Sequence, residues 1–127
     1  MQNDLRQLWD LEQGVIIVPK LQMAASVWQR SAGLLGKKSL DTDYGMWIAP
    51  CGSIHTFFMK FAIDVVFING KGEVTHIIPD LQPWRIGAAP AKTRAALELP
   101  AGACSRIGLK VGSRVLVTTS GTPDFKG

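Results

Sequence analysis

Short apolar runs, most of them followed by glycine or proline, recur along the chain and predict strands more often than helices. Runs of β-branched and aromatic residues bounded by turn residues are typical of strands. Proline lacks the amide hydrogen that a strand donates to its neighbour, so we expect the first run to end at Pro19 and a later one at Pro100. The expected strands cover residues 15–18, 45–50, 54–59, 63–68, 73–78, 94–99 and 114–119.

The turn Asn69-Gly70-Lys71-Gly72 predicts one hairpin directly. Asparagine and glycine adopt positive φ angles at little cost, as the tight turns of hairpins require. Because apolar, β-branched runs flank the turn on both sides, we expect residues 63–68 and 73–78 to pair antiparallel. No helix follows the turn, which excludes a phosphate-binding loop.

Helical patterns are few and short. Ser26 and Gln29 have the spacing of a capping box, and apolar residues at helical intervals then predict a helix over residues 27–35. The remaining expectations are a second short helix over residues 103–109, a short helix or a docked arm over residues 3–12, and a frayed tail over residues 121–127.

These elements together predict a mainly β (α+β) fold. We expect a small, barrel-like curled sheet of about six or seven short strands, with about two short helices at its periphery. The 127 residues fit a single domain, with an N-terminal arm over residues 1–12 and a core over about 14–119. Apolar residues make up 46% of the chain and charged residues 19%, which is typical of a packed globular protein.

The net charge of +4 is distributed unevenly, since residues 81–127 carry seven basic and only two acidic side chains. These cations are spread out, and Trp84 is the only aromatic residue among them before Phe125. Nucleic-acid-binding proteins concentrate their charge and interleave aromatic residues. We therefore expect a solvated basic face and no nucleic-acid partner.

Several absences favour a cytoplasmic protein. No apolar run approaches the ~20 residues that a helix needs to cross a bilayer, so no membrane partner is expected. The N-terminus lacks the basic start and apolar core of a secretory signal peptide. Cys51 and Cys104 lie far apart in the sequence, and we expect both to be reduced thiols.

Residues 54–67, with the sequence IHTFFMKFAIDVVF, carry the most specific signal. They resemble the hallmark of a prokaryotic family called domain of unknown function 192. The resemblance covers about residues 15–117; it implies a compact, mostly β fold similar to a small barrel and no particular reaction. Further motifs that match in order are Arg30-x-x-Gly33-Leu34-Leu35, Gly45-Met46, Pro50-Cys51, Pro83-Trp84-Arg85, LELPAG at 97–102 and Gly112.

His55 and Asp64 are polar residues that this segment sets among apolar ones. If residues 54–58 and 63–67 form a hairpin, the two lie opposite or diagonal to each other and their side chains can meet. Such a pair could act as a general base and the carboxylate that orients it. The alternative is structural: a buried histidine satisfied by a hydrogen bond, and an aspartate that accepts hydrogen bonds from nearby amides, from Thr56 or from His55.

Glu98 and the Trp84-Arg85 pair extend the candidate site. Glu98 lies within an apolar run and is expected either to face solvent or to line a pocket. Trp84 and Arg85 set a planar cation beside an indole, an arrangement that can hold a carboxylate, a phosphate or a sugar. Alternatively, the indole packs against the protein and the arginine pairs with Asp80 or Glu98.

Two other kinds of site receive less support. Cys51 could act as a nucleophile together with His55, although a buried structural thiol is the more common outcome. No metal and no cofactor is expected, because the possible ligands lack the spacing of zinc sites. These possible ligands are His55, Asp64, His76 and Glu98.

We expect a small domain that binds a polar or anionic small molecule in a cleft near His55, Asp64 and Arg85. One alternative is a structural or protein-interaction module without a ligand. Another is a hydrolase or isomerase that uses His55 with Asp64 or with Cys51. Binding modules and enzymes share such residue types, so the sequence leaves these alternatives open. The candidate ligand-binding residues are His55, Thr56, Lys60, Asp64, Trp84, Arg85 and Glu98.

Overall fold

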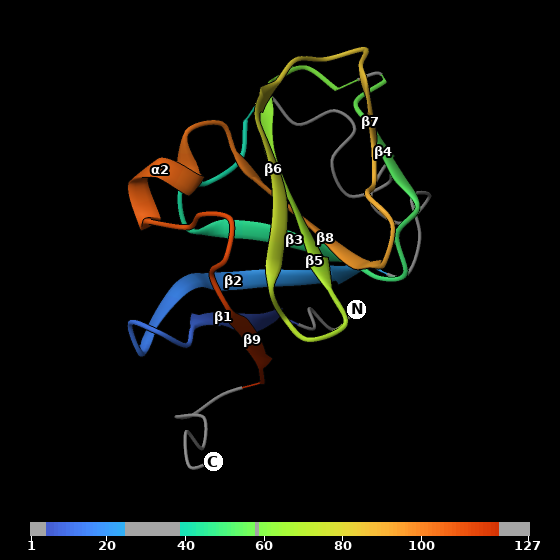
Figure 1. Cartoon of the computed structure of the whole chain (residues 1–127). Helices are drawn as coiled ribbons and strands as arrows, with labels where there is room; N and C mark the ends of the chain where they lie inside the picture. Colours follow the sequence, from blue (N-terminus) through green and yellow to red (C-terminus); the bar gives the residue numbers. More distant parts are fainter. Residues whose placement is uncertain (1–4, 25–38, 58, 120–127) are drawn as a thin grey trace.

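The computed structural model describes residues 5–24, 39–57 and 59–119, and this part of the chain is mainly β (Figure 1). Its strands form a seven-stranded sheet, ordered β6-β5-β8-β3-β2-β1-β9, and a two-stranded ribbon, β4-β7. The elements are β1 (Leu5–Asp10), β2 (Val15–Ala24), β3 (Tyr44–Ile48), β4 (Ser53–His55), β5 (Ile63–Asn69), β6 (Val74–Leu81), β7 (Ile86–Ala88), β8 (Thr93–Pro100), the short helix α2 (Ala103–Ile107) and β9 (Val115–Thr118).

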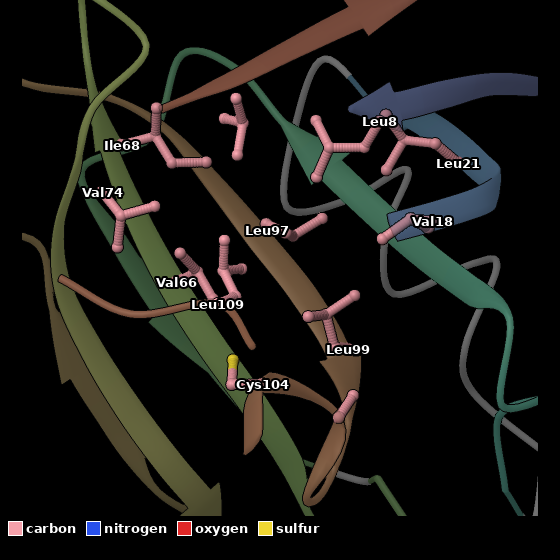
Figure 2. Close-up of a cluster of buried hydrophobic side chains, with 12 residues drawn as sticks. Leu8, Val18, Leu21, Val66, Ile68, Val74, Leu97, Leu99, Cys104 and Leu109 are labelled. Atoms are coloured by element: carbon pink, nitrogen blue, oxygen red, sulfur yellow. The ribbon is translucent and has the colours of Figure 1, made fainter. Parts of the chain in front are cut away.

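Strands β5 and β8 are neighbours in the sheet and are buried on both faces. Successive side chains of a strand point to opposite faces, so each strand contributes to two cores, which is why both strands have nearly continuous apolar sequences. The first core consists of Leu8, Val18, Leu21, Val66, Ile68, Val74, Leu97, Leu99, Ala103, Cys104, Leu109 and Val115 (Figure 2). The second core consists of Ala24, Met46, Ile48, Ile54, Met59, Ile63, Val65, Phe67 and Ala96.

The predicted hairpin between β5 and β6 is confirmed. The two strands pair antiparallel, with Val66 opposite Ile77. In the turn, the Asn69 side-chain oxygen accepts hydrogen bonds from the amides of Lys71 at 2.9 Å and Glu73 at 3.0 Å. Strand β6 continues through Pro79 to Leu81, beyond the predicted end at residue 78. A proline is tolerated there because β6 is an edge strand of the sheet.

The N-terminal part differs from the prediction in two ways. Residues 5–10 form strand β1, paired with both β2 and β9, so of the two alternatives for residues 3–12 the short helix is wrong and the arm docks on the sheet as a strand. Strand β2 passes through Pro19 and extends to Ala24. Pro19 takes part in neither ladder, since pairing with β1 shifts register beside it and parallel pairing with β3 begins at Lys20. The proline therefore removes no hydrogen bond from the sheet.

The segment after β3 folds differently from the expected strand over residues 54–59. Strand β4 has only three residues and pairs with β7, which lies in the connection between β6 and β8. The hairpin of residues 54–58 with 63–67, on which a contact between His55 and Asp64 depended, is therefore not formed. The backbone leaves the strand after His55 because Thr56 forms hydrogen bonds with the loop before β7 instead. In Figure 1 the ribbon stands to one side of the larger sheet.

The large sheet is not closed into a barrel, so the predicted barrel-like closure is not found. Its end strands, β6 and β9, form no ladder with each other. The chain just before each of them is joined at a seam, where the backbones of Glu73 and Arg114 form an isolated β-bridge and the Val115 amide donates to the Gly72 carbonyl at 2.9 Å. The predicted helix over residues 103–109 is confirmed as the shorter helix α2, which ends at Ile107 with Gly108 as its C-cap. The predicted helix over 27–35 and the predicted tail over 121–127 lie outside the described residues.

Candidate functional site

The β4-β7 ribbon has one buried and one exposed face. Ile54 and Gly87 lie opposite each other and face the second core. Ile54 is fully buried, and a Cβ atom on Gly87 would come within 2.8 Å of the Ile78 side chain. His55 and Ile86 form the next pair of the ladder, so their side chains point to the opposite side.

Four side chains make up the exposed side of the ribbon and the loop beside it, which we call the ribbon face: His55, Phe57, Trp84 and Ile86. The rings of His55 and Phe57 stack with centroids 5.0 Å apart and an interplanar angle of 28°. The Phe57 and Trp84 rings follow at 5.8 Å and 30°. Trp84 remains 55% exposed and Ile86 66% exposed. A row of three neighbouring rings, the first two stacked and the third tilted, therefore ends in an accessible indole.

Thr56 positions the ribbon face from below. Its side chain is fully buried; the hydroxyl donates to the Gln82 carbonyl at 2.6 Å and accepts from the Arg85 amide at 2.9 Å. Its own amide donates to the Arg85 carbonyl at 2.9 Å, and its carbonyl accepts from the Trp84 amide at 3.0 Å. These bonds hold Trp84 at a φ of 64°, in the left-handed region that bulky residues rarely adopt.

Arg85 and Lys60, the two cationic residues among the predicted ligand-binding residues, are exposed. The Arg85 guanidinium donates to the backbone carbonyl of the preceding residue, Trp84, at 3.4 Å. It forms no ion pair with any acid among the described residues, so the predicted pairing with Asp80 or Glu98 is not found. Arg85 is thus available to an anion that reaches the ribbon face.

Asp64 has a structural position away from the ribbon face. It is 2% exposed, and its carboxylate accepts hydrogen bonds from the backbone amides of Asp80 at 3.0 Å, Gly102 at 3.1 Å and Cys104 at 3.0 Å. The predicted contact with His55 requires the hairpin that does not form. The structural alternative is confirmed, with backbone amides as the donors. Asp64 ties the end of β6 and the start of α2 to strand β5.

Both cysteines are free thiols, which confirms the prediction that they are reduced. Burial, the Asp64 charge and a hydrogen bond to Asp64 raise the pKa of the Cys104 thiol to about 12. Cys104 is therefore protonated at neutral pH and is no nucleophile. Cys51 is half-buried, and its thiol donates to the Ser53 carbonyl at 3.6 Å.

Glu98 is fully buried, which contradicts the expectation that it faces solvent. It lies opposite Met46 of β3 and Val65 of β5 in the two ladders, on the face of the sheet that carries the second core. Burial and then the Glu98 charge raise the pKa of Tyr44 to about 12. Both faces of β8 are covered, so Glu98 does not reach the exposed ribbon face.

Sequence reasoning missed two adjoining hollows beside the turn that joins β5 and β6. We call the first, of about 410 Å³, the apolar hollow, because Met23, Trp47, Ile68 and Val117 are among its lining residues. The second, of about 460 Å³, we call the basic hollow: its lining residues are Asn69, Gly70, Lys71, Lys92 and Arg94. These cations are far apart in the sequence but converge because Asn69 of β5 pairs with Thr93 of β8.

Two features are absent from residues 5–24, 39–57 and 59–119: a cluster of metal ligands and a membrane-spanning helix. Within these ranges no three His, Cys, Asp or Glu side chains come together as metal ligands would. The same residues contain no helix with the length and apolar character needed to span a bilayer.

Comparison with known proteins yields relatives of unknown activity. The family model DUF192, described as "Uncharacterized ACR", matches residues 11–117. A UPF0127 protein of Pyrococcus horikoshii is 32% identical over 102 residues, which cover 76% of this chain and 85% of that protein. A UPF0127 protein of Pyrococcus furiosus is 35% identical over 63 residues, 50% of this chain and 53% of that one. A crystal structure of a protein of unknown function from Novosphingobium aromaticivorans has a similar fold, with a TM-score of 0.69 at 22% identity, over 76% of this chain and 74% of that one.

Proposed function

The chain belongs to the DUF192 family, and from its own residues we propose that it is a small binding protein whose ligand stacks on the ribbon face. The ligand is a polar or anionic small molecule with a flat surface. Its ring lies against the exposed Trp84 indole, and Arg85 binds its polar or anionic group. Asp64, Thr56 and Glu98 act beneath the surface as structural residues.

The conformation of Trp84 is the observation that carries this proposal. A tryptophan with a φ of 64° and 55% exposure gains little from burial and bears backbone strain. The buried Thr56 hydrogen bonds maintain this costly arrangement. Strained residues that the surrounding structure holds in place cluster at binding sites. An exposed indole next to a guanidinium offers both a stacking surface and directed donors to sugars, phosphates or carboxylates.

Titration of isotope-labelled protein, followed by NMR, tests the proposal. The probes are glucose, glucose 6-phosphate and benzoate, which separate a neutral ring, an anionic sugar and a flat anion. We expect at least one of them to shift the Trp84 indole signal in a saturable manner. Trp84→Ala should then weaken its binding at least about tenfold. Val111→Ala is the matched control, since Val111 is also an exposed apolar residue, at 59%, and lies outside the ribbon face.

The proposal is wrong if none of the three probes causes a saturable shift up to roughly 10 mM, a concentration that detects even weak ligands. It is equally wrong if Trp84→Ala binds the successful probe as well as the unchanged protein does.

A protein-interaction role is the second candidate, because Ile86 adds exposed apolar area to the ribbon face. A protein partner would cover the whole ribbon face, so Ile86→Ala should weaken binding of that partner about as much as Trp84→Ala does. A stacked small molecule depends mainly on Trp84. The two candidates therefore differ in the effect of Ile86→Ala.

A hydrolase or isomerase has weaker support. The Asp64 carboxylate accepts hydrogen bonds from three backbone amides, so it does not orient His55. Cys51 with His55 is the version of this candidate that the geometry leaves open.

A further inference from the structure

The apolar hollow opens into the first core at the seam between β9 and the β5-β6 turn. Ile68 and Val115, which line it, belong to the first core, and Met23, Trp47 and Val117 pack against that core while partly buried. The seam is joined by the Glu73–Arg114 bridge and a few backbone hydrogen bonds instead of a continuous ladder. Because the sheet does not close at this seam, the apolar hollow remains open there. Its volume of about 410 Å³ is within the size range of small-molecule pockets.

Three exposed cations border this surface: Lys71 in the turn, Lys92 just before β8 and Arg94 at the start of β8. Among the described residues, no acidic side chain lines either hollow. Uncompensated positive charge beside an apolar surface is complementary to a ligand with a negative group and an apolar part.

Arg94 connects the two hollows, because it lines both of them. Within the described part of the chain its side chain forms no hydrogen bond or ion pair. Its stem lies over Gly70, where a Cβ atom would come within 3.4 Å of both Cγ and Nε of Arg94. Gly70 thus lets the guanidinium lie along the turn, at the boundary between apolar and basic surfaces.

We propose that the two hollows together bind an amphipathic carboxylate. The apolar tail of this ligand lies in the apolar hollow, against Trp47 and Ile68. Its carboxylate lies in the basic hollow, where Arg94 binds it through paired N–H donors and Lys71 and Lys92 add positive charge. Different residues form the ribbon face, so this site does not depend on the function proposed above.

Calorimetric titration of the full chain with octanoate tests the proposal. Octan-1-ol has the same tail without the charge, and butanoate has the charge with a shorter tail. We expect octanoate to bind at a single site and both comparison compounds to bind at least about tenfold more weakly. Equal binding of octan-1-ol would contradict the role of the cations, and equal binding of butanoate would contradict the role of the apolar hollow.

Substitutions locate the site. Arg94→Gln removes an exposed charge and should weaken octanoate binding at least about tenfold, whereas Lys110→Gln, which removes an exposed charge outside the hollows, should not. In NMR spectra, octanoate should shift the Trp47 indole signal. The proposal fails if octanoate does not bind, or if Arg94→Gln has no effect.

Trp84→Ala separates this proposal from the previous one, because it alters only the ribbon face. It should leave octanoate affinity unchanged. Octanoate binding that is lost in Trp84→Ala and kept in Arg94→Gln would assign the ligand to the ribbon face and overturn the proposed second site.

Discussion

Buried polar side chains in this protein serve mainly to hold loops in place. Asp64 is 2% exposed and Thr56 is fully buried, yet each is surrounded by backbone partners from distant parts of the chain. A buried carboxylate or hydroxyl is costly unless it forms hydrogen bonds, and here the partners are backbone groups that no ladder satisfies. Single residues thereby decide the course of the connections that follow β6 and β8.

Asp64→Ala should lower the free energy of unfolding by roughly 2–4 kcal/mol, because three amides lose the acceptor that they share. Urea denaturation followed by circular dichroism measures the change as a shift in midpoint. Asp41→Ala is the control: Asp41 is exposed, and its replacement should change stability by less than about 0.5 kcal/mol. Equal midpoints for the two variants would contradict the structural role of Asp64.

Thr56→Val keeps the shape of the side chain but removes its hydroxyl. The Gln82 carbonyl and the Arg85 amide then lose a partner, and we expect a loss of about 1–3 kcal/mol in unfolding free energy. The Arg85 amide should also exchange its hydrogen faster, because its acceptor is the missing oxygen.

Thr75→Val provides the comparison for Thr56→Val, since the Thr75 hydroxyl forms a longer bond of 3.3 Å in a half-buried position. Thr75→Val should lower the free energy of unfolding by less than Thr56→Val does. An Arg85 amide that exchanges at the same rate in the Thr56 variant and the unchanged protein would refute this account of the loop.

At the scale of elements, the seam between the β5-β6 turn and β9 depends on Gly72. Its φ of 79° lies in the region that favours glycine, and a Cβ atom there would lie 2.9 Å from the Val115 carbonyl oxygen. The Gly72 carbonyl also accepts the Val115 amide hydrogen bond. Glycine thus allows the turn to approach the backbone of β9 closely, although the two elements are far apart in the sequence.

Gly72→Ala should lower unfolding free energy by roughly 2–4 kcal/mol, from backbone strain together with the clash against β9. Gly14→Ala is a matched control, because Gly14 has a φ of 68° but nothing within 4 Å of its Cβ position. That variant should cost only about 1 kcal/mol. Thermal or urea denaturation of both variants measures the difference, and a loss no larger at Gly72 than at Gly14 would mean that β9 moves aside without penalty.

At the scale of the whole molecule, each core contains or borders a thiol or phenol whose pKa is raised by burial. Cys104 belongs to the first core and Tyr44 packs against the second. Burial is the main cause that raises the pKa of each to about 12, with a neighbouring carboxylate adding to it. The neutral forms of both groups are therefore favoured by folding.

Stability should consequently fall in alkaline solution. The unfolded chain releases the Cys104 proton near pH 9.0 and the Tyr44 proton near pH 10.0, whereas the folded protein holds both until about pH 12. Above pH 9 the folded state thus binds more protons than the unfolded state, and unfolding free energy decreases as pH rises. Urea midpoints measured from pH 8 to pH 11 test this.

Cys104→Ala and Tyr44→Phe serve as controls for the alkaline effect. Each removes one of the two groups, so each should make the decline shallower between pH 9 and about pH 11. A decline in both variants that is as steep as in the unchanged protein would show that other groups cause it.

Most strands of the large sheet, with the exception of β1 and the second half of β2, follow from local sequence patterns. Asn69 and its neighbouring glycines form the β5-β6 turn with nearby backbone groups, so a few adjacent residues suffice to predict the hairpin. The apolar residues 95–99 of β8, interrupted by Glu98, likewise predict a strand, and Asp64 within an apolar segment predicts a carboxylate that needs donors.

Only the tertiary structure decided which strands meet and which polar groups converge. The sequence of residues 54–58 fits a strand, but Thr56 binds the loop of residues 82–85 and strand β4 pairs with β7, so the hairpin that would set His55 opposite Asp64 does not form. Glu98 became buried because elements distant in the sequence cover both faces of β8. Lys71 and Arg94 border one hollow because β5 and β8 are neighbours. Local patterns encode turns and strand propensity within a few residues, whereas pairing between distant segments depends on the burial and hydrogen bonds that the whole chain can satisfy at once.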